Sequence, residues 1–235
     1  MPYKKSAARR GFETDLAKQI AMIRSAGPTK IPDPDVRAYI LSSAVALSSV
    51  AMEIYLETLV TQWISAVRAR GIAHSQFSKE LRWFVVFQSL LKVHFEKFSV
   101  TKNEGAFLEA MKKAWGGPNW DLFDETRAIS PGTNLNLAIE RKRYPSPDNL
   151  KTVFRRLGIP DIFNQLNRYA KTDVEALLSS FNDVRNNFAH SGVLVGFSVR
   201  DVVKTVRDLN RIVNAVDRAY FKHVAATCGL GCWTT

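Results

Sequence analysis

The chain has 235 residues, which is enough for one well-buried domain with an insertion or an appended segment. Its 33 Lys and Arg residues against 22 Asp and Glu residues give a formal net charge of +11, which favours polyanionic partners, nucleic acid before anionic membranes. The most apolar stretch, residues 38–60, is interrupted by serines and by Glu53 and Glu57, and no apolar segment follows the basic N-terminus. We therefore expect neither a membrane-spanning helix nor a secretory signal, and a cytoplasmic protein.

The first third of the chain predicts two helices. Residues 1–10 are basic, and we expect them to form a mobile arm. Apolar residues recur at helical spacing over residues 12–24, and the glycine and prolines of residues 27–34 end that helix. Residues 35–70 predict a long helix that stops at Gly71. Apolar side chains nearly encircle its first part, which predicts a central, buried element.

The middle of the chain is less regular. Residues 77–97 predict a further helix. Residues 103–147 contain glycine, proline and charged clusters, and we expect a loop-rich insertion with one or two short helices, or with a local sheet. Residues 148–157 and 160–169 predict two short helices, and Gly158 separates them.

Two late helices have signals at their starts. Thr172 and Glu175 have the spacing of a capping box, in which both side chains satisfy free backbone N–H groups, and this helix should run to about residue 190. Ser198 and Asp201 repeat the arrangement at the start of the last helix. Strand-like alternation is scarce throughout, which indicates an all-α bundle. We predict a basic arm and short helix over residues 1–34, a helical domain over residues 35–228 that contains the insertion, and a tail over residues 229–235.

The last helix has a basic face. Arg200, Lys204, Arg207, Arg211 and Arg218 lie at offsets of 4, 7, 11 and 18 residues, which places them on one side of a helix. Such a stripe is either a solvated surface or a track for phosphates. We name Arg200, Lys204, Arg207 and Arg211 as candidate RNA-binding residues.

The chain places Arg185, Asn186, Asn187 and His190 within six positions, just ahead of Gly192. Guanidinium and imidazole groups can together hold a phosphodiester and move its protons. A five-residue offset on a regular helix turns about 140° and rises about 7.5 Å, so Arg185 and His190 converge only if the helix ends near His190. The alternative is a structural role, in which the arginine caps carbonyls and the histidine fills a crevice.

The same spacing recurs at Arg218 and His223 inside the last helix. This second pair lacks the asparagine after the arginine and the Ser-Gly after the histidine, and we treat it as a chance repeat. The sequence contains no glycine-rich phosphate loop, no serine-nucleophile elbow and no His-Glu-x-x-His pair.

Metal-binding candidates are weak. Cys228 and Cys232 cannot complete a zinc site, and no histidine cluster accompanies them. Asp121, Asp124 and Glu125 are more typical of a solvated acidic turn than of a divalent-ion site. We therefore predict no metal and no cofactor.

The segment Arg185-Asn186-Asn187-Phe188-Ala189-His190 resembles the signature of HEPN domains, which are small helical bundles of bacterial toxin, phage-defence and RNA-processing ribonucleases. Residues 46–57, in which Tyr55 follows Glu53 by two positions, resemble the first core helix of the RiboL-PSP-HEPN branch. Residues 149–159 resemble its short middle helix. The resemblance covers roughly residues 36–226 in order.

The resemblance implies an antiparallel helical core, a symmetric homodimer with one composite cleft, and metal-free cleavage of RNA to 2′,3′-cyclic phosphate ends. By position, Arg185 would stabilise the negative charge of the transition state. His190 would act as general base or general acid, and the second subunit's copy would supply the other role. Asn186 would orient the phosphate or the catalytic groups. Glu53, with Glu57 as the less favoured choice, would hold Arg185 or His190 in place.

By analogy, the resemblance implies a toxin or an antiphage effector, with an antitoxin or a partner defence protein as a further partner. The competing interpretation is a catalytically inactive HEPN-type module that binds RNA, a nucleotide or a partner protein through the same cleft. A basic helical DNA-binding protein is a third option, although the sequence shows no recognition-helix motif.

Overall fold

The computed structural model describes residues 2–27, 29–115, 120–130, 132–191 and 196–235, and for residues 188–191 it describes the backbone alone. These residues form helices and no β-strand, and an antiparallel bridge between Ala73 and Ala128 is isolated. The predicted all-α fold is therefore confirmed. The local sheet that we considered for the insertion is not formed by its described residues.

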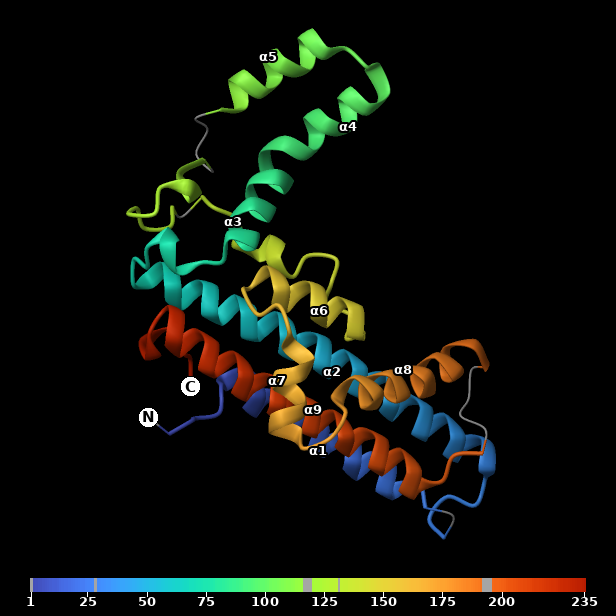
Figure 1. The fold of residues 1–235 in the computed structure, drawn as a ribbon. Helices are drawn as coiled ribbons and strands as arrows, with labels where there is room; N and C mark the ends of the chain where they lie inside the picture. Colours follow the sequence, from blue (N-terminus) through green and yellow to red (C-terminus); the bar gives the residue numbers. More distant parts are fainter. Residues whose placement is uncertain (1, 28, 116–119, 131, 192–195) are drawn as a thin grey trace.

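Two long antiparallel helices and a third that packs against both make up the centre of the bundle. α1 (Ala7–Ser25) and α2 (Pro34–Ala69) run side by side, and α9 (Val199–Thr227) contacts both (Figure 1). α2 begins close to the predicted residue, because Asp33 caps its free N–H groups and Pro34 occupies its first turn.

The capping box and the apolar stripe that the sequence predicts for α9 are both confirmed. Its first turn is closed by a capping box between Ser198 and Asp201. Its apolar stripe faces the core and consists of Val202, Val206, Leu209, Val213, Val216 and Tyr220, all buried.

The basic N-terminal segment is not the mobile arm that we expected, because α1 already begins at residue 7 and the preceding residues pack against α9. The fully buried carboxylate of Asp217 accepts hydrogen bonds from the Tyr3 hydroxyl (2.5 Å), the Ser6 hydroxyl (2.5 Å) and the Ser6 backbone N–H (3.1 Å). The Tyr55 hydroxyl of α2 donates to it as well (3.4 Å). Burial and the Asp217 carboxylate raise the pKa of Tyr3, so its hydroxyl remains a donor. A buried charge requires such partners, and they fix the N-terminus in place.

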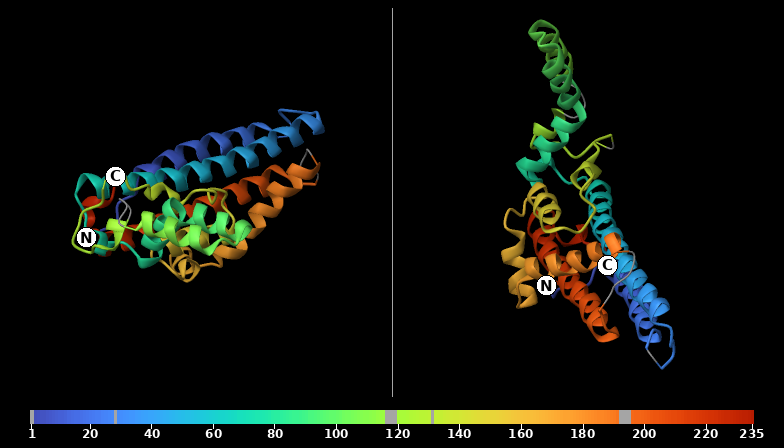
Figure 2. Two further views of the ribbon diagram at one scale, coloured as in Figure 1. Left: turned by 90° about the horizontal axis from the view of Figure 1, so that it is seen from above. Right: turned by 90° about the vertical axis from the view of Figure 1, so that its right-hand side faces the viewer.

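The helix predicted over residues 77–97 is longer and changes pitch. α3 (Lys79–Val86), a π-helical turn (Phe87–Leu91) and α4 (Lys92–Thr101) follow one another directly. α5 (Glu104–Ala114) folds back on α4, and the two project from the bundle as a hairpin (Figures 1 and 2). No residue of α4 or α5 is buried.

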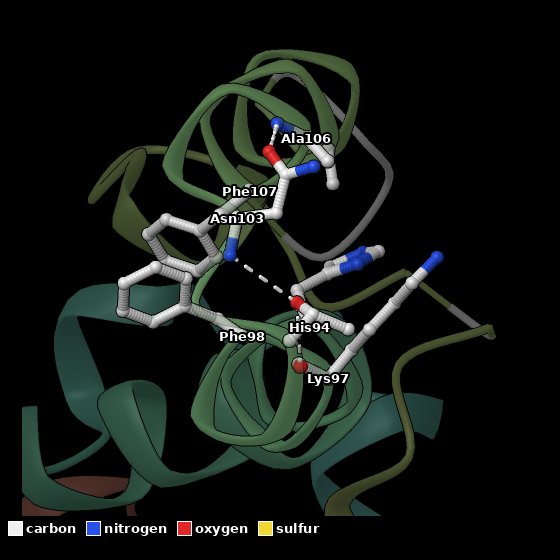
Figure 3. Close-up of a pocket in the computed structure, with 8 residues that line it drawn as sticks. His94, Lys97, Phe98, Asn103, Ala106 and Phe107 are labelled. Carbon is white, nitrogen blue, oxygen red and sulfur yellow. Dashed lines mark hydrogen bonds between the residues drawn. The ribbon is translucent and has the colours of Figure 1, made fainter.

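The interior of this hairpin is visible in Figure 3. Phe98 and Phe107 pack with 4.8 Å between ring centroids, and the Asn103 side chain caps α5 by accepting from the Ala106 N–H (3.0 Å). The hairpin is thus held by its own contacts. The described remainder of the insertion contains two short 3-10 turns, Trp120–Phe123 and Leu135–Ala138.

Three helices cover the other side of α2 and α9. They are α6 (Pro147–Arg156), α7 (Ile162–Ala170) and α8 (Val174–Ser191), all close to the predicted ranges. The capping box predicted at Thr172 is wrong, because the neighbouring Asp173 carboxylate accepts from the backbone N–H of residue 176 (3.0 Å). Glu175, the expected second member, pairs with the Lys151 ammonium (2.6 Å) instead.

α2 contacts α1, α8 and α9 at the centre of the bundle, as the sequence predicts, but one of its faces remains exposed. One face is buried from Leu41 to Val67, but five apolar residues of the opposite face are 46 to 65 % exposed: Val36, Tyr39, Leu47, Val50 and Ile54. We call these five residues the α2 stripe. The helix is long and apolar enough to cross a membrane by composition alone, a property that it shares with core helices, and 56 % of its most apolar window is buried.

The Asp217 network predicts a stability effect. Asp217→Ala should lower the free energy of unfolding by at least about 3 kcal/mol, because it leaves several buried donors without an acceptor. Tyr3→Phe, which removes one donor, should cost about 1 kcal/mol. Urea unfolding followed by circular dichroism measures both. Asp15→Ala, which breaks an exposed pair with Lys18, is the control and should change stability by less than about 1 kcal/mol. Equal effects of Asp217→Ala and Asp15→Ala would contradict the role of the network.

Candidate active site

Three successive residues of α2 point in three directions. Tyr55 is 1 % exposed and packs toward α1, with its ring centroid 5.9 Å from that of Phe12. Ile54 is 54 % exposed and belongs to the α2 stripe. Glu53 is half-buried and interacts electrostatically with Arg185 of α8. It lies about 200° around the helix axis from Tyr55, because it is two residues away from it. The core residue Tyr55 therefore sets the direction of Glu53.

Arg185 is partly buried on α8 and has two contacts that orient its side chain. The guanidinium carbon lies 5.2 Å from the centre of the Tyr144 ring, in a cation–π arrangement. Its Nη1 donates a hydrogen bond to the side-chain oxygen of Asn186 (3.3 Å). Neither contact neutralises the positive charge, so the guanidinium remains able to bind an anion.

Glu53, Arg185 and Tyr144, which we call the Arg185 cluster, interact electrostatically with one another. Burial raises the pKa of Glu53, and the positive charge of Arg185 acts in the opposite direction. Burial likewise raises the pKa of Tyr144; Arg185 opposes that rise, whereas Glu53 and Asp183 reinforce it. Glu57, the less favoured candidate, instead pairs with the Arg143 guanidinium (3.0 Å). Of the two candidate acids, Glu53 is therefore the one whose pKa depends on the charge of Arg185.

Sequence reasoning missed the residues that support Arg185. The Tyr144 hydroxyl donates to the Asn182 side-chain oxygen (3.2 Å), and the Asn182 amide donates to the Pro145 carbonyl (3.1 Å). Asn182 could have been found, because it precedes Arg185 by three positions and Asn186 by four and so shares their helix face. Tyr144 is 41 residues before Arg185 in the sequence, and no local pattern links the two.

His190 lies in the last turn of α8, which ends at Ser191, as the sequence predicts. Its side chain is outside the described residues, so the structure does not test its convergence with Arg185.

The four candidate RNA-binding residues Arg200, Lys204, Arg207 and Arg211 are exposed along α9. Arg211 is partly engaged, since its guanidinium pairs with Asp208 (3.4 Å) and donates to the Ala170 carbonyl (3.4 Å). No hydrogen bond or ion pair among the described side chains joins this stripe to Arg185 or Glu53. The stripe and the Arg185 cluster are therefore separate features of the described surface.

The three acidic residues of the insertion form ion pairs with arginine side chains. Arg127 pairs with Asp121 (3.2 Å) and with Asp124 (3.1 Å), and Arg82 lies 3.5 Å from Glu125. These ion pairs account for the three acids that we considered as cation ligands.

The coupling of Glu53 and Arg185 predicts a measurable shift. Arg185→Ala should raise the pKa of Glu53 further, because the variant removes the cation that opposes the effect of burial. A ¹³C NMR titration of the side-chain carboxyl groups measures it, with Glu53→Gln to assign the signal. Arg143→Ala removes a neighbouring cation that pairs with Glu57 and serves as the control. If both arginine variants shift Glu53 alike, the specific coupling does not exist.

A model of the family described as RiboL-PSP-HEPN matches residues 14–221, a range that includes α2, α8 and most of α9. Among curated proteins and among solved structures, none matches this chain. The family match spans most of the 235 residues and both helices that carry Glu53 and Arg185. The chain belongs to the RiboL-PSP-HEPN family and contains a HEPN-type module.

Proposed function

We propose that the protein is a metal-independent endoribonuclease whose active site is built around Arg185. The observation that carries the proposal is a guanidinium oriented by Tyr144 and Asn186, left free to bind a phosphate, and placed beside the half-buried Glu53. Membership of a family whose members are often ribonucleases and a net charge of +11 support an RNA substrate.

The reaction that fits these groups is attack of a ribose 2′-hydroxyl on the adjacent phosphorus. A general base removes the 2′-proton, the new P–O2′ bond forms, and the P–O5′ bond breaks while a general acid protonates the leaving 5′-oxygen. The products are a 2′,3′-cyclic phosphate and a 5′-hydroxyl. Arg185 stabilises the charge on the non-bridging oxygens in the transition state. His190 serves as base or acid, Asn186 orients the phosphate, and Glu53 positions Arg185.

The second proton-transfer group comes from a second copy of the chain, which makes the active site composite. The α2 stripe supports a homodimer, because several exposed apolar residues on one helix face are typical of an interaction site. Ile54 belongs to this stripe and is adjacent to Glu53, so a copy docked there would reach the candidate active site. The biological role that follows is that of a toxin or antiphage effector, held inactive by an antitoxin or a partner defence protein.

Cleavage is the first prediction of this proposal. Purified protein in excess EDTA should cleave RNA and leave 2′,3′-cyclic phosphate ends, detected by mass spectrometry of the fragments. His190→Ala should lower kcat by about 10²–10⁴-fold and Arg185→Ala by about 10²–10³-fold.

His94→Ala, which removes a histidine from the α4–α5 hairpin, is the control and should cleave as wild type does. Folding of each variant is checked by circular dichroism. Cleavage that survives both Arg185→Ala and His190→Ala would rule out this active site. Tight RNA binding without turnover in wild type would instead identify a catalytically inactive module.

Dimerisation is the second prediction. Val50→Asp places a charge in the middle of the α2 stripe and should yield a monomer in light scattering, with loss of cleavage. Val100→Asp makes the same change at an 83 % exposed valine of α4 and should leave both properties unchanged. A Val50→Asp protein that remains dimeric would show that the subunits meet elsewhere.

A further inference from the structure

A groove separate from the Arg185 cluster runs between α7 and the second half of α9. α7 crosses α9 on the outside of the bundle (Figure 1). Two adjoining hollows of about 440 and 470 Å³ share Tyr169, Lys222 and Ala226 as lining residues. Each volume is in the range of sites for small molecules or single nucleotides.

The groove has a strongly positive lining. Arg168, Lys222 and Arg218 line it, and its described lining includes no Asp or Glu. No described residue forms a hydrogen bond or ion pair with the side chain of Arg168 or Lys222, whereas Arg218 lies over the Tyr3 ring at 4.7 Å. Charge complementarity therefore selects an anion, and two of the three cations are available to it.

The groove also offers aromatic surface. The Tyr169 side chain lines both hollows and leaves 36 % of its residue surface exposed. His223 lines the first hollow. Its ring forms a hydrogen bond with the Leu157 backbone, and burial lowers the pKa of the His223 imidazole. An exposed aromatic ring in a groove lined by cations is the arrangement by which proteins stack a base and bind the adjoining phosphates. Arg218 and His223, which we treated as a chance repeat, thus line this groove.

The groove continues the basic stripe of α9. Lys204, Arg207, Arg211, Arg218 and Lys222 follow one another at intervals of three, four, seven and four residues, so they share one helix face. From Lys204 to Lys222 this face is about 27 Å long, since a helix rises 1.5 Å per residue. A polymer with regularly spaced charges matches such a track better than a single small anion does.

We propose that the α7–α9 groove is an exosite for single-stranded RNA, in which one base stacks on Tyr169 while Arg168 and Lys222 bind the flanking phosphates. The inference rests on the proposed RNA substrate and is independent of the cleavage step. The exosite selects single strands, because a base within a duplex cannot expose its face to the tyrosine. It holds the substrate at a distance from Arg185 and so increases affinity without taking part in the reaction.

The test is fluorescence anisotropy with a labelled 2′-O-methyl RNA oligonucleotide, which lacks the attacking hydroxyl and cannot be cleaved. Tyr169→Ala should weaken binding about five- to 150-fold, and Tyr169→Phe, which keeps the ring, should bind as wild type does. The double variant Arg168→Ala/Lys222→Ala should lower the slope of log K against log salt by about 1.4, because each phosphate contact on a single strand contributes about 0.7. Lys112→Ala/Lys113→Ala on α5 removes the same charge and should leave the slope unchanged.

Several results would overturn the exosite. They are Tyr169→Ala binding equal to wild type, equal salt slopes for the two double variants, and equal affinity for a duplex of the same sequence. Displacement of the oligonucleotide by equimolar ATP would identify a site for free nucleotides instead. Tyr169-dependent binding by a wild-type protein that cleaves no RNA would uphold the exosite and reject the proposed nuclease, so the two failures are distinguishable.

Discussion

The packing of Tyr55 of α2 against α1 and α9 is the constraint on which the rest of the structure depends. Its ring lies against Phe12 of α1, and its hydroxyl reaches the buried Asp217 of α9. These two contacts fix the rotation of α2 about its own axis. With that rotation fixed, helical geometry alone turns Glu53 toward α8 and Ile54 toward solvent. One core residue therefore determines which face of α2 lies near Arg185 and which face is exposed.

The Arg185 cluster then assembles from three parts of the chain that are far apart in sequence. Glu53 comes from α2, Tyr144 from the end of the insertion and Arg185 from α8. The hydrogen bond from Tyr144 to Asn182 connects the insertion to α8. The Tyr144 ring therefore contacts α8 twice, through its hydroxyl at Asn182 and through its face at Arg185. The Arg185 guanidinium is therefore oriented by protein contacts alone, which is the preorganisation that the proposed phosphate-binding role requires.

The sequence predicts those features whose causes are local. Helix starts at Asp33 and Ser198 follow from side chains within three residues, and the end of α8 falls near His190 as predicted. The failures have non-local or competing causes. Thr172 and Asp173 are adjacent and both favour a helix N-cap, and Asp173 is the residue that caps α8. The N-terminal segment is ordered by hydrogen bonds to Asp217, which is more than 200 residues away in the sequence. Hydrophobic periodicity also cannot distinguish an apolar face that is buried from one that stays exposed, so the exposure of the α2 stripe does not follow from the sequence.

Glu53 belongs to the Arg185 cluster and is the sequence neighbour of Ile54 in the α2 stripe, so the proposed dimer interface would adjoin the proposed active site. In the single chain Glu53 is half-buried, and its attraction to Arg185 is weakened by the surrounding water. A second copy seated on the α2 stripe would exclude water from this edge and lower the effective dielectric constant around both groups. The Glu53–Arg185 attraction strengthens under those conditions, and so does the attraction of Arg185 to a phosphate. Under the proposed function, dimerisation would thus strengthen the attraction of the already oriented Arg185 to a phosphate, in addition to supplying the second proton-transfer group.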